Sequence, residues 1–200
     1  MVLFAPILLL IALLIKIEDP DGPVIYRNIR IGKDGKPFTL YKFRYMYWKY
    51  CVKDAYGVSP SQDSALKYEK ELIASDKNTR TGPIYKITQK DPRKMRIARF
   101  TERYTLDELP QLINVLIGNM SLVGPRPHQP REVEKYDEWH LQVLTAKPGM
   151  TGMAQVYARE SADFNLEVEL DRYYIEHWSY ALDLRLIVGT FGVLFNRNRS

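Results

Sequence analysis

The 200-residue sequence contains one cysteine, Cys51, and only three histidines, which lie far apart along the chain. A single cysteine cannot form an intrachain disulfide, so a cytosol-facing environment is the default expectation. The histidine spacing does not match a zinc motif such as HExxH, and one cysteine cannot supply the remaining ligands. The 11 glycines form neither a GxGxxG fingerprint nor a Walker A loop. Rossmann and P-loop nucleotide sites are therefore excluded.

Internal repeats and low-complexity tracts are also missing, and 46% hydrophobic with 26% charged residues is typical of a folded protein. The length fits one domain over residues 1–200. The net charge of +5 suggests an anionic partner, and nucleic acid, anionic lipid and nucleotide phosphates all qualify. A soluble nucleic-acid binder would show a basic stripe with interleaved aromatic residues. Because the cations are scattered, we expect no nucleic-acid partner.

Residues 1–15 are apolar throughout, with Pro6 among them. As a helix they would be roughly 22 Å long, which is short of the ~30 Å hydrocarbon core of a bilayer. A signal peptide would need a basic start and a small-residue cleavage site, and both are absent. Pro6 predicts a break or kink. Three interpretations stay open: a re-entrant membrane helix, the tail of a longer spanning helix, or a buried core helix. Membrane insertion is favoured by the apolar surface.

Residues 22–46 alternate in polarity and contain turn residues. Val24–Tyr26 and Phe38–Tyr41 predict two short strands around the turn Gly32–Gly35. An ordinary hairpin accounts for this pattern but not for its cluster of cations. We interpret that cluster as a possible phosphate-facing edge, formed by Arg27, Arg30, Lys42 and Arg44.

Residues 47–82 are polar and predict a peripheral insertion with one amphipathic helix. Helical spacing of apolar residues predicts helices over 65–75, 109–120, 132–145, 167–178 and 184–195. The last of these is too short to span a bilayer and is followed by Arg197 and Arg199. It fits an interfacial helix with its cations among lipid headgroups. A core helix with a basic C-terminus is the alternative.

The segment Thr105–Gln111 reads TLDELPQ. Pro110 predicts that a helix begins near Asp107, and Thr105 with Glu108 has the spacing of a capping box. Capping alone would explain these residues. A carboxylate at a helix start would also be favoured in its ionised form, beside N–H groups that can hold phosphate. Two adjacent carboxylates predict a bound cation, for which Mg²⁺ is the natural choice, with Asp107 and Glu108 as ligands.

Several motifs occur in order over most of the chain: PILLLIALLIKIEDPDGPV, YKFRYM, DPR, LDELPQLINVLIGNMSLVGPRP, KPGMTGMAQVYAR and ELDRYYIEHWS. With these motifs the sequence resembles the bacterial sugar transferase family, the monotopic polyprenyl-phosphate phosphoglycosyl transferases. The resemblance implies a mostly helical α+β fold. Its parts would be a re-entrant N-terminal membrane helix, a small β-hairpin, and interfacial amphipathic helices around an Asp-Glu helix.

The resemblance also implies a reaction. Asp107 would attack the β-phosphate of a UDP-sugar and release UMP, and Glu108 would help to bind Mg²⁺. A polyprenyl phosphate, usually undecaprenyl phosphate, would then take the phosphosugar from the enzyme. This would be the first membrane step in assembling an exopolysaccharide, capsule or O-antigen. The implied substrate-binding residues are Lys42, Arg44, Arg103, Gln111, Arg126, Gln155 and Arg159.

The same resemblance places the protein at the cytoplasmic face of the bacterial inner membrane, in contact with lipid, and leaves open a homodimer. The sequence departs from the family at Glu102 and Tyr104, where an arginine and a small residue are usual. Arg103 could supply the missing charge. These departures motivate an alternative, a catalytically inactive membrane scaffold that binds nucleotide sugar. The chain also begins further into the first helix than family members do, which leaves open an upstream part of a longer protein.

Overall fold

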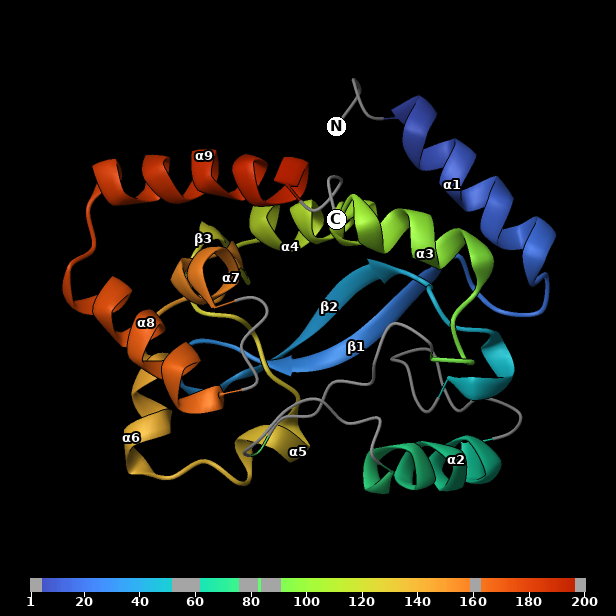
Figure 1. The fold of residues 1–200 in the computed structure, drawn as a ribbon, viewed down its shortest axis with the longest axis horizontal. Coiled ribbons are helices and arrows are strands. Elements are labelled where there is room, and N and C mark those ends of the chain that lie inside the picture. Colours follow the sequence, from blue (N-terminus) through green and yellow to red (C-terminus); the bar gives the residue numbers. More distant parts are fainter. Residues whose placement is uncertain (1–4, 52–61, 76–82, 84–90, 159–162, 197–200) are drawn as a thin grey trace.

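The computed structural model describes residues 5–51, 62–75, 83, 91–158 and 163–196 (Figure 1). Among these residues, short helices surround a two-stranded antiparallel hairpin, and a second pair of very short strands is parallel. Helices α1, α3, α4 and α9 run along one side of the hairpin, and α2, α5 and α6 lie on the other side (Figure 1). This mostly helical α+β architecture confirms the predicted fold class.

The central hairpin consists of β1 (Ile25–Ile31) and β2 (Pro37–Phe43), which pair along their whole lengths. Between them Lys33–Gly35 forms a 3₁₀ turn in which Asp34 and Gly35 have positive φ angles of 58° and 73°. Aspartate and glycine enter this left-handed region at low cost, so the turn suits the sequence. The hairpin predicted around residues 32–35 is confirmed.

Helix α1 (Ala5–Glu18) packs one face against α3 (Arg96–Arg103) and the end of β2. The core between them consists of Ile11, Ile15, Phe43, Met95 and Ala98. Pro6 lies in the first turn of the helix as described, where a missing N–H costs little. The described helix runs on from Pro6 to Glu18, and residues 1–4, where the predicted break would fall, lie outside the described residues.

The rest of the α1 surface is apolar and has no protein covering it among the described residues. Leu9, Leu13 and Ile17 are 70%, 58% and 69% exposed, whereas Ile11 and Ile15 are buried. A fully buried core helix is thus the wrong interpretation for this segment. None of the described helices combines the length and the apolar character needed to cross a bilayer. The re-entrant path stays a prediction.

The Asp-Glu segment is more broken than the sequence predicted. Leu106–Glu108 is a 3₁₀ turn, and α4 covers only Gln111–Leu116. Pro110 occupies the N-cap position of α4, and Thr105 adopts a left-handed conformation with φ of 56°. No side-chain cap bond is present at the 3₁₀ turn, so the predicted capping box is wrong. Gly118, with a φ of 84°, ends the helical segment two residues before the predicted end at residue 120.

The parallel pair, which the sequence did not predict, joins β3 (Ser121–Val123) to β4 (Gly149–Thr151). Glycines allow their backbones to touch. A Cβ on Gly149 would lie 2.1 Å from the backbone nitrogen of Gly124, and a Cβ on Gly152 would lie 2.2 Å from the oxygen of Gly124. The motifs GPRP and KPGMTG thus meet because three residues lack side chains.

The predicted helix over 132–145 is instead three short elements. One capping box, at Gln129, starts a helix before residue 132, and a second, at Asp137, starts a new helix inside the predicted range. These elements are α5 (Pro130–Val133), α6 (Glu138–Leu141) and the 3₁₀ turn Gln142–Thr145. The remaining helices are the 3₁₀ turn Trp48–Tyr50, α2 (Gln62–Ala74), α7 (Met153–Tyr157), α8 (Phe164–Glu176) and α9 (Tyr180–Asn196).

Helix α9 packs against the core with one face and exposes another. Leu186 is fully buried against Val123, Met153 and Tyr174. Leu184, Val188 and Phe191 recur at helical spacing and are each more than half exposed. The helix therefore rests on the core by one stripe and presents a second apolar stripe outward. The helix therefore combines features of both interpretations of residues 184–195, the interfacial helix and the core helix.

Candidate active site

Asp107 and Glu108 lie side by side in the 3₁₀ turn that leads into α4. Asp107 is buried, with 6% of its surface exposed. Lys42 of β2 donates a hydrogen bond from Nζ to Oε1 of Glu108 at 2.8 Å. Strand β2 and the acidic turn, 66 residues apart, are thereby joined by an ion pair. The convergence of Lys42 with the acidic pair was a prediction from the family motifs, and the geometry agrees with it.

Burial is the largest influence on Asp107 and raises its pKa to about 6. Lys42 opposes this shift, whereas the nearby carboxylates of Glu108 and Glu102 add to it. The sequence predicted that the position of Asp107 at a helix start would favour its ionised form. That prediction is wrong for the net effect, because desolvation outweighs the favourable contacts. A carboxylate with a pKa of about 6 is mostly ionised at neutral pH and is a stronger nucleophile than an ordinary aspartate.

Helix α4 is fastened to the edge of the hairpin by Asn114, whose side chain is completely buried. Its Nδ2 donates to the backbone oxygen of Thr39 at 2.6 Å, and its Oδ1 accepts from the backbone N–H of Tyr41 at 3.1 Å. The amide thus takes the place of a neighbouring strand and satisfies the edge of β2. This contact holds the acidic turn against Lys42.

Asp171 of α8 fixes the proline-rich turn around Arg126 by hydrogen bonding to its backbone. The Asp171 carboxylate accepts from the backbone N–H of Arg126 and from that of Ala154 in α7, both at 3.4 Å. Its complete burial raises the pKa of Asp171 to about 7. One carboxyl group therefore connects the turn after β3 with the helix after β4.

A polar cleft collects most of the predicted site residues. Its lining includes Lys42, Glu108, Gln111, Arg126 and Gln155, together with Arg30 of β1. The Oε1 atom of Gln155 is buried and has no hydrogen-bond partner within the described part of the chain. Burial and the neighbouring Arg126 lower the pKa of Arg30, although Glu132 opposes them. Adjacent cations and an unsatisfied amide suit an anionic, hydrogen-bonding ligand.

Two predicted substrate-binding residues, Arg44 and Arg103, do not line this cleft, and a third falls outside the described part of the chain. Arg44 is buried, forms an ion pair with Asp19, and donates from Nε to the backbone oxygen of Pro23 at 2.7 Å. It fastens the chain after α1 instead of joining the acidic pair. Arg103 lies exposed at the end of α3. Arg159 lies outside the described residues.

Across the described residues, no group of three or more His, Cys, Asp and Glu side chains could hold a metal by itself. Mg²⁺ differs from zinc in this respect, because one or two carboxylates plus substrate phosphates suffice. Asp107 and Glu108 provide such a pair of oxygen donors. The pKa of Asp107 is raised mainly by burial and further by the carboxylates of Glu108 and Glu102, and a cation would relieve that second contribution. The donor set is therefore compatible with the predicted Mg²⁺.

Two residues that our site predictions omitted belong to this region. Arg30 was noticed as part of a basic hairpin edge but was not assigned to the site, and it lines the cleft. Asp171 stands within the motif ELDRYY, which pointed to the family but to no role. The sequence signal that could have identified Asp171 was an acidic residue at helical spacing from the apolar residues of the helix predicted over 167–178.

The chain matches the family model described as bacterial sugar transferase over residues 1–197. It therefore belongs to the bacterial sugar transferase family.

Curated relatives agree with this placement. The chain is 39% identical over 192 residues to a Salmonella typhimurium protein named undecaprenyl-phosphate galactose phosphotransferase, covering 95% of this chain and 37% of that one. It is 38% identical over 197 residues to an uncharacterized sugar transferase of Haemophilus influenzae, covering 98% and 38%. The exopolysaccharide production protein ExoY of Rhizobium meliloti is 33% identical over 192 residues, covering 95% and 77%. The chain thus spans less than two fifths of the length of the first two relatives.

Proposed function

We propose that this chain transfers a phosphosugar from a UDP-sugar to undecaprenyl phosphate and releases UMP. The observation that carries the proposal is the buried Asp107 directly before Glu108, whose ion pair with Lys42 lies at a cleft that also contains Arg126. Family membership and the printed names of relatives with several different sugars support the reaction class. The step would begin assembly of an exopolysaccharide, capsule or O-antigen.

In the first half-reaction the Asp107 carboxylate attacks the β-phosphorus of the UDP-sugar. A bond forms between the carboxylate oxygen and phosphorus, the bond to the bridging oxygen breaks, and UMP leaves with that oxygen. Arg126 and Arg30 line the cleft where the charge of the leaving phosphate develops. Cations fixed in place before the reaction stabilise such charge without reorganisation.

In the second half-reaction an oxygen of undecaprenyl phosphate attacks the phosphorus held on Asp107. The acyl-phosphate bond breaks, the carboxylate is regenerated, and the product is an undecaprenyl diphosphate sugar. Lys42 faces the acidic turn and offsets its negative charge when the anionic acceptor approaches. Covalent catalysis divides one difficult displacement into two easier ones.

Mg²⁺ bound by Asp107 and Glu108 would neutralise phosphate charge as a Lewis acid. Within the protein, Lys42 sets the position of the Glu108 carboxylate at 2.8 Å, and so orients one of the two proposed ligands. We expect activity to depend on a divalent cation for this reason.

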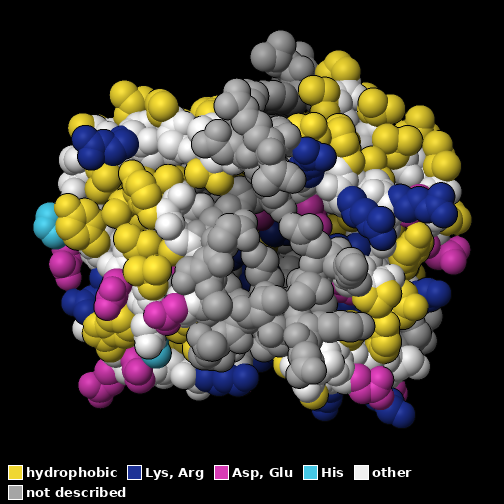
Figure 2. Space-filling view, viewed as in Figure 1, with side chains coloured by type: hydrophobic (Ala, Val, Ile, Leu, Met, Phe, Trp, Pro, Cys, Tyr) yellow, Lys and Arg dark blue, Asp and Glu magenta, His cyan; other side chains and the backbone are white. Residues whose placement is uncertain are grey.

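We also propose that the apolar side of the molecule contacts the cytoplasmic leaflet of the bacterial inner membrane. Helices α1, α4 and α9 lie along one side in Figure 1, and Figure 2 shows hydrophobic side chains over its upper part. Each exposed aliphatic side chain would contribute about 1 kcal/mol or more on entering lipid. The more than half-exposed apolar residues there are Leu9, Leu10, Leu13, Ile17, Leu116, Ile117, Leu184, Val188 and Phe191.

The test is to incubate the protein in detergent or nanodiscs with Mg²⁺, undecaprenyl phosphate and a panel of UDP-sugars, and to quantify UMP. We expect UMP from at least one donor, and none from Asp107→Asn. UDP-sugar binding without UMP release would favour the inactive scaffold. UMP release that survives Asp107→Asn would exclude the aspartyl mechanism.

A further inference from the structure

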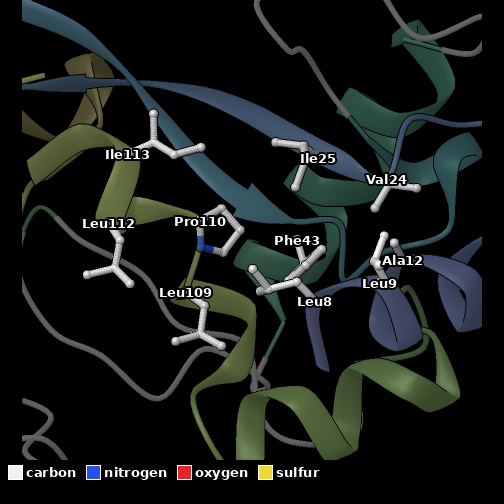
Figure 3. Close-up of a pocket in the computed structure, with 10 residues that line it drawn as sticks. All are labelled: Leu8, Leu9, Ala12, Val24, Ile25, Phe43, Leu109, Pro110, Leu112 and Ile113. Carbon is white, nitrogen blue, oxygen red and sulfur yellow. The ribbon is translucent and has the colours of Figure 1, made fainter. Parts of the chain in front are cut away.

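An apolar cavity of about 220 Å³ lies between α1 and the segment that starts α4 (Figure 3). Three parts of the chain form its wall: α1, the paired ends of the hairpin strands, and the residues that follow the acidic pair. Leu8 and Ala12, Ile25 and Phe43, and Pro110 and Ile113 represent these three parts, and their side chains surround a common space. All of the residues that line the cavity are apolar.

The cavity adjoins the proposed reaction site through the covalent chain. Leu109 and Pro110 line it and come directly after Glu108. Consecutive Cα atoms are about 3.8 Å apart, so Pro110 lies within about 8 Å of Glu108. Two of the lining residues, Leu9 and Ile113, are 70% and 37% exposed. The apolar wall thus extends from exposed apolar residues to the residues that directly follow the acidic pair.

We propose that this cavity binds the isoprene units next to the phosphate of the polyprenyl phosphate acceptor, an inference that rests on the proposed function. The acceptor is a phosphate attached to a long apolar chain, and it needs an apolar site directly beside the phosphate site. A cavity of about 150 Å³ holds one benzene molecule of six carbons, so 220 Å³ holds one to two five-carbon units. The remaining isoprene units would extend along α1 into lipid.

The acyl chain of a phospholipid would fit the same apolar wall, but it would bring no terminal phosphate to Asp107. The neighbouring cation also discriminates between these occupants. Lys42 lies in β2 one residue before Phe43, which contributes to the cavity wall. Because successive side chains of a strand point to opposite faces, Lys42 leaves the other face of β2, where it forms its ion pair with Glu108. The strand that forms the apolar wall therefore also carries the charge that would receive a phosphate.

Two substitutions that fill the cavity from opposite walls test this assignment, Ala12→Phe and Ile113→Trp, with Ala181→Phe as the matched control. Ala181 is exposed on α9 and lies outside the cavity lining. We compare undecaprenyl phosphate with geranyl phosphate, which has only two isoprene units. Both filled variants should raise the acceptor KM for both lipids by about tenfold or more, since excluding even two methylene groups of the isoprene chain has that effect. The KM for UDP-sugar should not change, and thermal unfolding checks that the variants are folded.

An unchanged acceptor KM in both folded variants would overturn the cavity assignment while leaving wild-type UMP release, and hence the proposed function, intact. A defect seen only with undecaprenyl phosphate would also overturn it, because distal units would then occupy the cavity.

A measurement independent of turnover uses geranyl phosphate carrying a diazirine, photo-crosslinked to the full chain in nanodiscs and mapped by mass spectrometry. We expect labels on α1 or residues 109–113 that undecaprenyl phosphate displaces and phosphatidylglycerol does not. Equal displacement by phosphatidylglycerol would identify an acyl-chain site and overturn the proposal. Specific labelling without any UMP formation would uphold the cavity and reject the proposed reaction.

Discussion

The Asp171 carboxylate accepts a hydrogen bond from the backbone N–H of Arg126, a residue 45 positions earlier, at 3.4 Å. Through its other oxygen it holds Ala154, and so it sets the distance between the two segments that carry Arg126 and Gln155. Both of those side chains line the polar cleft. The geometry of the cleft therefore depends on a carboxyl group that does not itself line it.

Asp171→Ala should raise the KM for the UDP-sugar by about tenfold, because losing two hydrogen bonds of about 1 kcal/mol each frees the Arg126 turn. Asp171→Asn keeps an acceptor and should recover part of the loss. Steady-state kinetics of UMP release measure both variants. An Asp171→Ala enzyme that loses thermal stability but keeps the wild-type KM would show that Asp171 acts on the fold alone.

Asp107→Asn should stabilise the folded protein above pH 6. Burial raises the pKa of Asp107 to about 6 from an ordinary value of 3.8, so the folded state holds a proton that the unfolded state has lost. Stability from this group is complete below pH 3.8 and is lost as the pH rises through 6. The variant should gain up to about 3 kcal/mol over wild type at pH 7.5. Unfolding measured from pH 4 to pH 8 checks this, and a pH-independent difference would contradict it.

Glu102→Gln should shift the acid limb of the pH–rate profile to lower pH. Glu102 is one of the carboxylates that raise the pKa of Asp107, after burial and together with Glu108. Removing its charge lets Asp107 ionise at lower pH, so more enzyme carries the nucleophilic form below pH 6. The exposed Glu134→Gln on the distant α5 region is the control and should leave the profile in place. A shift toward higher pH would reverse the assigned role of Glu102.

Lys42→Met should lower kcat/KM by about a hundredfold, the loss typical of removing one fixed charge from a reaction site. The ion pair from Nζ to Glu108 at 2.8 Å would be lost, and the negative turn would repel anionic substrates. Lys36→Met removes an exposed lysine of the same hairpin and is the matched control for net charge. Equal losses in the two variants would indicate a general electrostatic effect.

Arg44→Met should destabilise the protein by about 3 kcal/mol, since it leaves the partner carboxylate of a buried ion pair unpaired. Arg44 pairs with Asp19 and is 1% exposed, so it connects the end of α1 to β2. Arg44→Lys keeps the positive charge but loses the planar guanidinium group, so its stability should lie between those of the wild type and Arg44→Met. Chemical unfolding measures the difference. If Arg44→Met destabilises the protein no more than the same substitution at an exposed arginine does, the structural role of Arg44 is contradicted.

Elements formed by interactions between residues close in sequence were predictable, and elements formed by residues far apart in sequence were not. The hairpin at residues 25–43 was predictable because alternation and a GKDG turn act within a few residues. The long helix predicted over 132–145 was wrong, because capping boxes at Gln129 and Asp137 compete with apolar periodicity. The parallel pair of β3 and β4 has no local signal, since its strands are three residues long and far apart in sequence.

The sequence by itself determined the family and the candidate residues, because ordered motifs such as LDELPQ and GPRP preserve chemistry at fixed spacing. Only the tertiary structure decided which cations meet the acidic pair: Lys42 forms the ion pair with Glu108, whereas Arg44, directly after the end of β2, forms an ion pair with Asp19. It also decided the direction of the Asp107 pKa, which burial raises although the local turn suggested the opposite. Desolvation and long-range pairing depend on what packs around a residue, and neighbours in the sequence do not specify that packing.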